Sequence, residues 1–533
     1  MEVLTSEHPK YMTEINSKDI ILSRQLKLLA GSGILEKYTI MANICRYKKR
    51  FGIWIENKEV FNMAYYDELE KFGNKVALIE ESGNKITYAA MQNICSDIGK
   101  LVKRGLVFSF CENSIGSVSG YVAFLSNRVV PVLIDKGMDK TLVYNLISTY
   151  KPNYLYFPES MKKEFEYVEC IYENNGYMLC DTGRKEEYKL YSELGLLLTT
   201  SGSTGSPKFV RQSYVNIQTN ADQIARYLKI TGDDRPITTL PMNYTYGLSI
   251  INSHLLCGST ILLTAKTLMD RSFWTFLKKE NATTFGGVPY TYEILKKLRF
   301  LKMDLPSLKY ITQAGGKLTP ELHKEFAEYA LNNNKQFIVM YGQCEATARM
   351  AYLPADKSLE KYGSMGVAIP DGKLELIDIN GNVINESDVV GELVYYGPNV
   401  TLGYAECEAD LSKDDERKGR LETGDMAKRD AEGYYYIVGR KKRFLKIYGN
   451  RVNLDETERM LKTYLQLELA CSGVDDHLVV YVTSSDEEIQ NKAKHFLSEK
   501  TGLNSAAFSV KSVEEIPKNE SGKTLYRKLE EMI

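Results

Sequence analysis

The chain has little histidine, and its cysteines form no metal-binding or disulfide pattern. Only five histidines occur in 533 residues, and none has the spacing of a metal-binding motif such as HExxH. Nine cysteines are scattered along the chain without a close CxxC pair. This excludes a readable zinc framework and a disulfide scaffold, so we expect a protein of the reducing cytoplasm.

The chain also lacks an excess of charge of one sign, a leader pattern and a membrane span. Lys and Arg total 68 and Asp and Glu total 69, which excludes a nucleic-acid partner that needs a broad basic surface. The first residues show no basic segment followed by an apolar one. The most apolar stretch, residues 247–265, is interrupted by polar residues. We interpret it as a buried helix followed by a strand, with His254 as a core residue.

The remaining composition is that of a globular protein with more than one domain. Hydrophobic residues make up 44% and charged residues 26% of the chain, and 533 residues are too many for one hydrophobic core. Helix and strand patterns alternate from about residue 61, which predicts an α/β fold with layered, largely parallel sheets. We expect a helical extension over 1–59, a large domain with a β-hairpin part over 60–441, and a small mobile α+β lid domain over 442–533.

Local patterns predict individual elements. Ser213 precedes apolar residues that recur at steps of three and four from Tyr214 to Leu228, which predicts a capped amphipathic helix. Residues 20–29 and 34–47 also have helical patterns, and residues 378–382 are typical of a hairpin turn.

The most informative segment is the run from Thr199 to Lys208. Every position from Thr199 to Pro207 is glycine, proline or a hydroxyl residue, and an apolar run over 194–198 precedes it. Backbone N–H groups and hydroxyls in such a loop suit the oxygens of a phosphate chain, and Lys208 adds a positive charge. The spacing differs from that of a Walker loop, and the loop alone fits a polar turn equally well.

Four further segments follow this loop along the chain. They are Tyr341-Gly342-Gln343-Cys344-Glu345-Ala346-Thr347, Glu422-Thr423-Gly424-Asp425, Gly439-Arg440 through Lys446 to Val452, and Pro517 to Thr524. Each is weak alone, because sequences such as Thr-Gly-Asp are common in turns. Their joint presence over more than half of the chain is hard to obtain by chance.

With these segments the chain resembles the adenylate-forming superfamily, which comprises acyl-CoA synthetases, stand-alone adenylation domains and luciferases. The resemblance covers roughly residues 60–533. It implies activation of a carboxylic acid by ATP to an acyl-adenylate, release of pyrophosphate, and transfer of the acyl group to a pantetheine thiol. ATP and Mg²⁺ are implied with it. A carboxylate is already ionised at neutral pH, so the chemistry needs cations and hydrogen-bond donors rather than a general base.

The resemblance also implies roles for residues that match the family's motifs. Tyr341 would stack near the adenine. Asp425 would bond the ribose hydroxyls beside Arg440. Glu345 would help to hold Mg²⁺, a cation that prefers oxygen ligands. The phosphate loop would comprise Thr200, Ser201, Gly202, Ser203, Thr204, Gly205 and Lys208, and further nucleotide-binding residues would be Gly315, Gly316, Gly342 and Cys344.

In the implied small domain, Lys523 would bridge the carboxylate and the α-phosphate. Its loss would raise the barrier by about 3–5 kcal/mol, on the order of a hundredfold or more in rate. Rotation at the hinge Lys442 would then carry Lys523 away and bring Lys446 and Gly449 to the acyl-adenylate. A glycine there lets a pantetheine arm approach the backbone. A basic surface turn is the alternative interpretation of Lys442 and Lys446.

The implied acyl pocket contains no candidate for holding an α-ammonium group. Relatives that activate amino acids use an aspartate at the position that aligns with Thr245, and threonine carries no charge. We therefore expect an aliphatic, aryl or hydroxy acid without an α-amino group. The pocket would be lined by Tyr244, Thr245, Tyr246, Gly286, Gly287, Val288, Gly315, Gly316 and Tyr341.

One motif position departs from the family's pattern. Cys344 stands where the family usually has threonine, and since a thiol is a weak donor, its contact with the α-phosphate should weaken by about 1 kcal/mol.

The sequence does not decide which molecule accepts the acyl group. Free CoA and the phosphopantetheine of an acyl or peptidyl carrier protein present the same thiol, and an amine or hydroxyl acceptor is a third possibility. A catalytically degenerate protein that binds AMP or ATP is the remaining alternative. The presence of Glu345, Asp425, Arg440 and Lys523 argues against it.

Overall fold

The computed structural model describes residues 64–184, 189–199, 208–448, 450–518 and 524–531, without the side chains of Lys442, Arg451 and Arg527. The helices predicted over 20–29 and 34–47 therefore lie outside the described residues. The same holds for Thr200 to Gly205, Gly449 and Lys523 among the predicted site residues.

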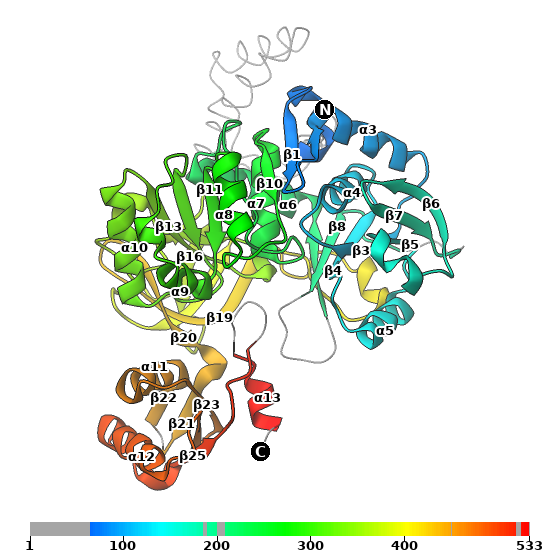
Figure 1. Cartoon of the computed structure of the whole chain (residues 1–533). Helices are drawn as coiled ribbons and strands as arrows, with labels where there is room; N and C mark the ends of the chain where they lie inside the picture. Colours follow the sequence, from blue (N-terminus) through cyan, green and yellow to red (C-terminus); the bar gives the residue numbers. More distant parts are fainter. Residues whose placement is uncertain (1–63, 185–188, 200–207, 449, 519–523, 532–533) are drawn as a thin grey trace, which may run out of the picture. The chain divides into compact units, whose positions relative to one another are not determined.

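An eight-stranded sheet forms the first layer of the large N-terminal part (Figure 1). Its strand order is β18-β9-β8-β4-β3-β5-β7-β6. The inner strands β8, β4, β3 and β5 run parallel, and the outer strands pair antiparallel. The strands are β3 (Leu106–Cys111), β4 (Val130–Asp135), β5 (Tyr154–Pro158), β6 (Glu169–Asn174), β7 (Tyr177–Asp181), β8 (Leu194–Thr199), β9 (Phe209–Ser213) and β18 (Gly403–Ala405).

Apolar side chains on the two faces of this sheet form two separate cores. Along β3, Phe108 packs into one core and Val107 into the other, because successive side chains of a strand alternate. Helix α5 (Lys140–Tyr150) packs on the first core, whereas α3 (Tyr88–Gly99) and α4 (Ile115–Ser126) pack on the second. Both faces of the parallel strands are therefore buried, which explains why residues 106–111 read as a nearly continuous apolar run.

A second sheet has the order β11-β12-β13-β14-β15, with β11, β12 and β13 parallel. Helices α8 (Arg271–Lys279), α9 (Pro289–Lys297) and α10 (Pro320–Asn332) pack on one face. Helices α6 (Tyr214–Leu228) and α7 (Thr245–Leu256) pack on the other and also contribute to a core of the first sheet. They thus form a layer between the two sheets (Figure 1). The strands are β11 (Thr284–Gly287), β12 (Tyr310–Gln313), β13 (Gln336–Tyr341), β14 (Ala351–Tyr352) and β15 (Val367–Ala368).

Helix α6 forms at the predicted bounds. The Ser213 hydroxyl accepts a hydrogen bond from the Asn216 amide at 3.0 Å, and the Asn216 side chain accepts one from the Ser213 amide at 2.9 Å. This reciprocal capping satisfies two donors that the first turn leaves free. The Asn216 side chain also donates to the carbonyl oxygens of Pro398 at 2.8 Å and Val400 at 2.9 Å. The cap therefore fixes the loop over residues 398–400, which leads to Thr401 and the candidate site.

The apolar stretch 247–265 forms most of α7 and then β10 (Ile261–Leu263), as predicted. His254 is buried, with Nδ1 2.8 Å from the Ile250 carbonyl oxygen and Nε2 3.2 Å from the Tyr310 hydroxyl oxygen. Burial lowers the pKa of His254 to about 4, so it is a neutral core residue, as expected. No helix in the described ranges has both the length and the apolarity to cross a membrane.

Two smaller sheets complete the large N-terminal part. Strands β10, β1 (Val76–Glu80) and β2 (Lys85–Thr87) form one, and β16 (Lys373–Ile377), β17 (Gly391–Tyr396), β19 (Arg420–Arg429) and β20 (Tyr435–Arg440) form an antiparallel four-stranded sheet. The predicted turn at 378–382 forms, because Asp378 Oδ1 accepts from the amides of Asn380 and Asn382 at 2.8 and 2.9 Å. The partner strand begins only at Gly391, since the exposed polar residues 385–388 cannot continue a half-buried strand.

The last ninety residues contribute elements with their own hydrophobic core. A core of buried residues between Leu445 and Phe508 draws all its members from this segment. The predicted helices and strands of this small C-terminal part are present as α11, α12, β24 and β25. The elements are β21 (Phe444–Ile447), β22 (Asn450–Asn453), α11 (Leu454–Leu465), β23 (Leu469–Val474), β24 (His477–Val482), α12 (Glu487–Thr501), β25 (Phe508–Ser512) and α13 (Tyr526–Glu531).

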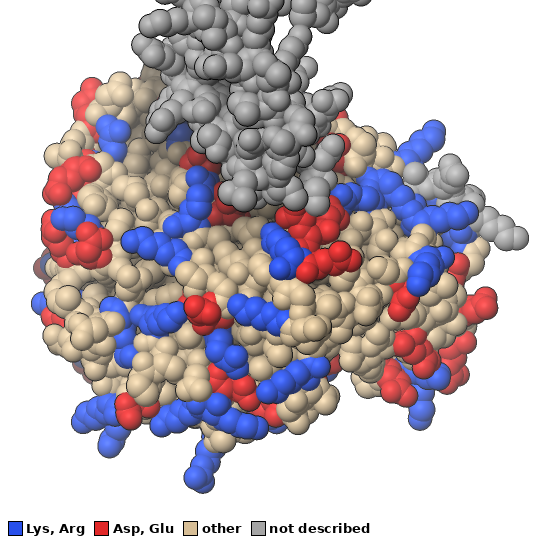
Figure 2. Space-filling view, turned by 90° about the horizontal axis from the view of Figure 1, so that it is seen from above, with Lys and Arg blue, Asp and Glu red and all other residues tan. Residues whose placement is uncertain are grey.

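The charged side chains are mixed over the surface in view. Figure 2 shows Lys and Arg side chains interspersed with Asp and Glu side chains over the described part of this face. Such mixing is what a net charge of −1 leads us to expect.

Candidate active site

Three segments that are far apart in the sequence place polar groups around Asp425. Strands β19 and β20 pair so that Asp425 lies opposite Arg440, with 3.1 Å between Asp425 Oδ1 and Arg440 Nε. Asp425 Oδ2 accepts hydrogen bonds from the Tyr341 hydroxyl at 2.5 Å and the Gln343 side-chain amide at 2.9 Å. Tyr341 ends β13, so the fold brings together the predicted adenine, ribose and arginine positions.

The environment of Asp425 makes it a strong hydrogen-bond acceptor. Burial raises the pKa of its carboxyl group, while Arg440, Tyr341 and Gln343 oppose that rise. Burial and the nearby Asp425 raise the pKa of Tyr341 well above its ordinary value, so the Tyr341 hydroxyl keeps its proton and donates it. The Arg440 side chain is 65% exposed, whereas the Asp425 carboxylate that it pairs with is buried.

The backbone after β13 needs glycine to reach Glu345. A Cβ atom on Gly342 would lie 1.7 Å from the Ala348 carbonyl oxygen, so no other residue fits this crossing. A 3₁₀ turn over Cys344–Ala346 follows and presents Glu345, with Cys344 half-buried at its start. The Thr401 amide and hydroxyl both donate to the Glu345 carbonyl oxygen, at 3.0 and 2.9 Å, and hold this turn in place.

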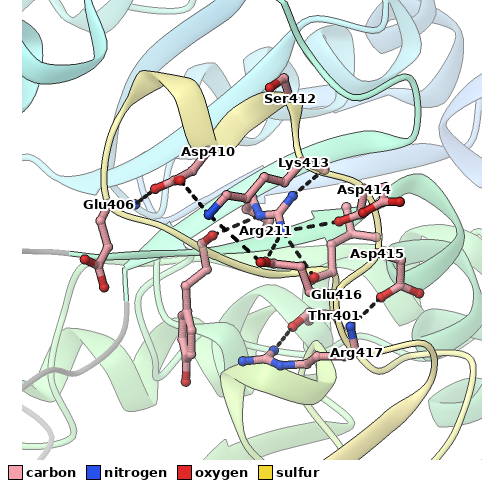
Figure 3. A network of polar contacts seen from close by, with 12 residues as sticks. Arg211, Thr401, Glu406, Asp410, Ser412, Lys413, Asp414, Asp415, Glu416 and Arg417 are labelled. Atoms are coloured by element: carbon pink, nitrogen blue, oxygen red, sulfur yellow. Dashed lines mark hydrogen bonds and ion pairs between the residues drawn. The ribbon is translucent and has the colours of Figure 1, made fainter.

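A second group of charged side chains surrounds Tyr404. Its hydroxyl donates to Glu345 Oε1 at 2.6 Å, and its ring centroid is 3.9 Å from Lys208 Nζ and 4.6 Å from Arg417 Cζ. Arg417 also donates to the Glu345 carbonyl oxygen at 3.3 Å and to the Thr401 hydroxyl (Figure 3). Two cations and one carboxylate thus surround one ring. Lys208 directly precedes β9, at the end of the predicted phosphate loop.

An open hollow of about 440 Å³ shares Tyr404 and Arg417 with this group, but the charges of its lining do not suit a phosphate. It is lined by Gly403, Tyr404, Glu406, Asp410, Lys413, Glu416 and Arg417. The Asp410 and Glu416 carboxylates already pair with the cations of Lys413 and Arg211 (Figure 3). Glu406 and Arg417 are then the remaining carboxylate and cation of the lining, so the hollow has no excess of positive charge for a phosphate, and we do not assign it to the nucleotide.

The residues predicted to line the acyl pocket meet at the start of α7. A Cβ atom on Gly315 would lie 2.7 Å from Tyr244 Oη and 3.0 Å from Val288 Cγ1. A Cβ atom on Gly286 would lie 2.8 Å from Tyr246 Oη. The two glycines therefore leave room for the two tyrosines, of which Tyr244 directly precedes α7 and Tyr246 lies in its first turn.

Three other predicted pocket residues have different surroundings. The Thr245 hydroxyl is buried and donates to the Thr347 carbonyl oxygen. The Cβ positions of Gly287 and Gly316 face Thr291 and Pro289, within 3.0 Å. These glycines shape the backbone around the pocket rather than open its interior.

The predicted residues of the C-terminal segment are only partly described. Lys446 lies exposed in β21, and its amide donates to Asp475 Oδ1 at 2.8 Å. Lys442 lies in a 3₁₀ turn over Lys441–Arg443, and Gly449 and Lys523 lie outside the described residues.

Comparison with known proteins decides the family. The family described as AMP-binding enzyme matches residues 66–405, which is more than half of the chain. This chain belongs to the AMP-binding enzyme family. The 2-succinylbenzoate–CoA ligase of a Bacillus cereus strain is 29% identical over 368 residues, which cover 66% of this AMP-binding enzyme and 73% of that relative.

Solved structures show the same fold for this AMP-binding enzyme. The o-succinylbenzoate CoA synthetase of Bacillus subtilis, in complex with the acyl-adenylate OSB-AMP, has a TM-score of 0.70 at 22% identity, and the match covers 87% of this chain and 97% of that chain. The same synthetase with ATP and a magnesium ion has a TM-score of 0.69 at 22% identity, covering 88% and 99%. The predicted fold class and the prediction of an ATP-dependent, AMP-forming acid–thiol ligase are confirmed.

Sequence reasoning missed four side chains of this AMP-binding enzyme. Gln343 lies inside a recognised motif but received no role. Tyr404, Arg417 and Arg349 carry no local pattern that separates them from other tyrosines and arginines. Only their packing beside Glu345, Lys208 and Tyr246 reveals them.

The side chains present fit a magnesium ion that is bound together with ATP. Mg²⁺ is usually held by one or two carboxylates and by substrate phosphates, not by an all-protein cage. Glu345 would offer one such carboxylate; its Oε1 accepts from the Tyr404 hydroxyl, and Lys208 lies over the ring of the same tyrosine. The described residues contain no group of three or more His, Cys, Asp or Glu side chains that could hold a metal by itself.

Proposed function

We propose that this enzyme joins a carboxylic acid without an α-amino group to coenzyme A, through an acyl-adenylate formed with ATP. The arrangement around Asp425 carries the proposal, because one buried carboxylate faces Arg440 and receives donors from Tyr341 and Gln343. The curated relatives are named CoA ligases, which favours CoA over a carrier protein as the acceptor.

In the first step, a carboxylate oxygen of the acid attacks the α-phosphorus of ATP. The bond from that phosphorus to the bridging oxygen breaks, and pyrophosphate leaves with the electron pair. Asp425 and Arg440 would hold the ribose, and Tyr341 would lie against the base. The step needs preorganised positive charge rather than a base.

The cations near Tyr404 would stabilise the leaving pyrophosphate. Lys208 and Arg417 both face the Tyr404 ring, and Lys208 follows in sequence the loop Thr200–Gly205, which we propose holds the β- and γ-phosphates. Glu345 would hold Mg²⁺, which neutralises charge on the phosphates. Lys523 would bridge the attacking carboxylate and the α-phosphate.

In the second step, the thiol sulfur of CoA attacks the acyl carbon. The bond from that carbon to the AMP oxygen breaks, AMP leaves, and the thiol proton passes to solvent. We propose that residues 442–533 form a lid which rotates at Lys442 between the steps and brings Lys446 and Gly449 to the adenylate. Residues 60–441 would form the domain that holds both substrates, and 1–59 an extension.

The surroundings of Thr245 support an acid without an α-amino group. Holding an ammonium ion in a buried pocket requires a carboxylate or several oxygen acceptors. The Thr245 hydroxyl is neutral, and its proton is already donated to the Thr347 carbonyl oxygen.

ATP–pyrophosphate exchange with a panel of acids tests this function. We expect exchange with acids that lack an α-amino group, and none with α-amino acids. Exchange driven by α-amino acids alone would overturn the pocket interpretation, and AMP binding without exchange across the panel would overturn the enzymatic function. The active acid is then incubated with ATP and either CoA or a phosphopantetheinylated carrier protein. Thioester on the carrier alone would refute CoA as the acceptor.

A further inference from the structure

Arg349 is a buried cation without an acidic partner. It is 2% exposed, and no described Asp or Glu forms an ion pair with it. Its Nη2 donates to the Ser249 hydroxyl at 3.0 Å and its Nη1 contacts the Met340 sulfur, while its Nε has no hydrogen-bond partner among the described residues. A hydroxyl is a neutral acceptor and a thioether a weak one. Arg349 also interacts with the neutral hydroxyls of Tyr227 and Tyr246, and it opposes the rise of their pKa that burial causes. No described carboxylate therefore balances the charge of this guanidinium.

Arg211 shows how the same chain satisfies a buried arginine. It is 0% exposed, yet each of its three nitrogens donates to oxygen (Figure 3). The acceptors are the Glu416 carboxylate and the carbonyl oxygens of Leu402, Tyr404, Lys413 and Asp414. A missing partner is therefore not a general property of buried arginines in this protein, and Arg349 needs its own explanation.

The Arg349 guanidinium lies against the predicted acyl pocket. Its Cζ is 4.0 Å from the ring centroid of Tyr246, whose hydroxyl oxygen would lie 2.8 Å from a Cβ atom on Gly286. Ser249 is one helical turn further along α7, and Met340 directly precedes Tyr341 on β13. The arginine is thus enclosed by the two elements that carry the predicted acyl and adenine positions.

We propose that Arg349 binds a second anionic group of the acid, so that the substrate is a dicarboxylic acid. One carboxylate would be adenylated, and the other would pair with Arg349. A guanidinium presents a planar set of donors that matches a carboxylate, and such pairs gain strength where water is excluded. An acid without the second carboxylate would enter the pocket and leave the buried charge unpaired, so the site discriminates against it. This inference rests on the proposed function and adds the substrate class to it.

The name of the relatives agrees with a dicarboxylic acid. The relatives are named for 2-succinylbenzoate, which carries two carboxyl groups. An uncompensated cation beside Tyr246 also repels an α-ammonium group, which agrees with the neutral Thr245.

Matched acids test the proposal on the unmodified full-length enzyme. The pairs are 2-succinylbenzoate with 4-oxo-4-phenylbutanoate, phthalate with benzoate, and adipate with hexanoate, which differ by one carboxyl group. We expect the best dicarboxylate to exceed its partner by about a hundredfold in kcat/KM for ATP–pyrophosphate exchange. A monocarboxylate that equals or exceeds its dicarboxylate partner in every active pair would overturn the assignment of Arg349, while the proposed function would stand.

Substitutions then connect the preference to Arg349. Arg349→Met keeps the length and removes the charge, so it should raise KM for the dicarboxylate and reduce the preference to less than about tenfold. Arg349→Lys should retain part of it. Arg226→Met, at an exposed arginine of α6 paired with Asp222 at 2.9 Å, is the matched control and should leave the preference unchanged.

The two failures are distinguishable. If no acid of the panel supports exchange, the proposed function is wrong and the assignment of Arg349 falls with it. If Arg349→Met keeps the full preference, only the assignment of Arg349 is wrong. If Arg349→Met does not fold, the comparison of matched acids on the unmodified enzyme decides the proposal.

Discussion

The substitution Asp425→Asn separates nucleotide binding from the stability of the fold. It keeps the shape of the side chain and removes the charge that faces Arg440 and accepts from Tyr341 and Gln343. Charge-assisted hydrogen bonds contribute about 1.5–3 kcal/mol each, and an amide keeps one acceptor oxygen for the ribose. We expect a net loss of about 2–3 kcal/mol, which raises the Kd for ATP about 30- to 150-fold.

The same substitution should not lower stability at neutral pH. Burial raises the pKa of Asp425 in the folded state above its value in the unfolded chain. The ionised carboxylate therefore opposes folding above the folded-state pKa, and this opposition disappears as the pH falls through the folded-state pKa towards the unfolded value. A neutral amide has no such pH dependence. Asp425→Asn should thus unfold at an equal or higher temperature at pH 7, and the difference should shrink in acid.

Asp430→Asn is the matched control for these measurements. Partial burial raises the pKa of Asp430, but hydrogen bonds from the Tyr434 amide and from Lys361 outweigh it and lower the pKa below its usual value. Its ionised form therefore supports folding above the unfolded-state pKa. The control should lose stability at pH 7 and bind ATP normally. ATP titrations and thermal unfolding at pH 7 and pH 4 measure both effects. If Asp425→Asn instead behaved like this control, Asp425 would be a structural ion-pair partner of Arg440 and not a nucleotide ligand.

Three further predictions test the remaining roles. Lys523→Ala should reduce ATP–pyrophosphate exchange about a hundredfold or more, whereas Lys446→Ala should leave exchange unchanged and slow CoA-dependent AMP release. If either variant lost both half-reactions equally, the two lysines would not have separate roles. Cys344→Thr restores a hydroxyl donor and should raise the exchange rate about fivefold, and an unchanged rate would mean that this side chain does not meet the α-phosphate. Tyr404→Phe removes the donor to Glu345 and should raise the Mg²⁺ concentration for half-maximal exchange about two- to tenfold; a lower unfolding temperature with unchanged Mg²⁺ dependence would assign Tyr404 to packing alone.

Local sequence patterns predicted the elements and the motif positions well. Helix α6 has the predicted bounds because Ser213 caps it and a single apolar face repeats along it. The motif around Tyr341 lies at the end of a buried strand, as its apolar run predicted. The hairpin after residue 377 was predicted less well, because the turn is encoded locally but the partner strand is chosen by pairing with β19.

The candidate site could be predicted only where function imposes a contiguous pattern. Asp425 and Arg440 fall in such segments and pair at one register position. Tyr404 and Arg417 approach Glu345 from a different part of the chain, through the packing of β18 on β9. No spacing rule applies to such contacts.

By itself, the sequence determined the α/β class, the order of the elements and the candidate residues of the nucleotide site, because capping, periodicity and motif composition are local properties. The tertiary structure decided which atoms surround each buried charge. Arg211 and Arg349 are indistinguishable as letters in the sequence, and both are buried. One is surrounded by oxygen acceptors and the other by a ring, a hydroxyl and a thioether. Compensation of a buried charge depends on atoms within a few ångströms, and only folding brings those atoms together.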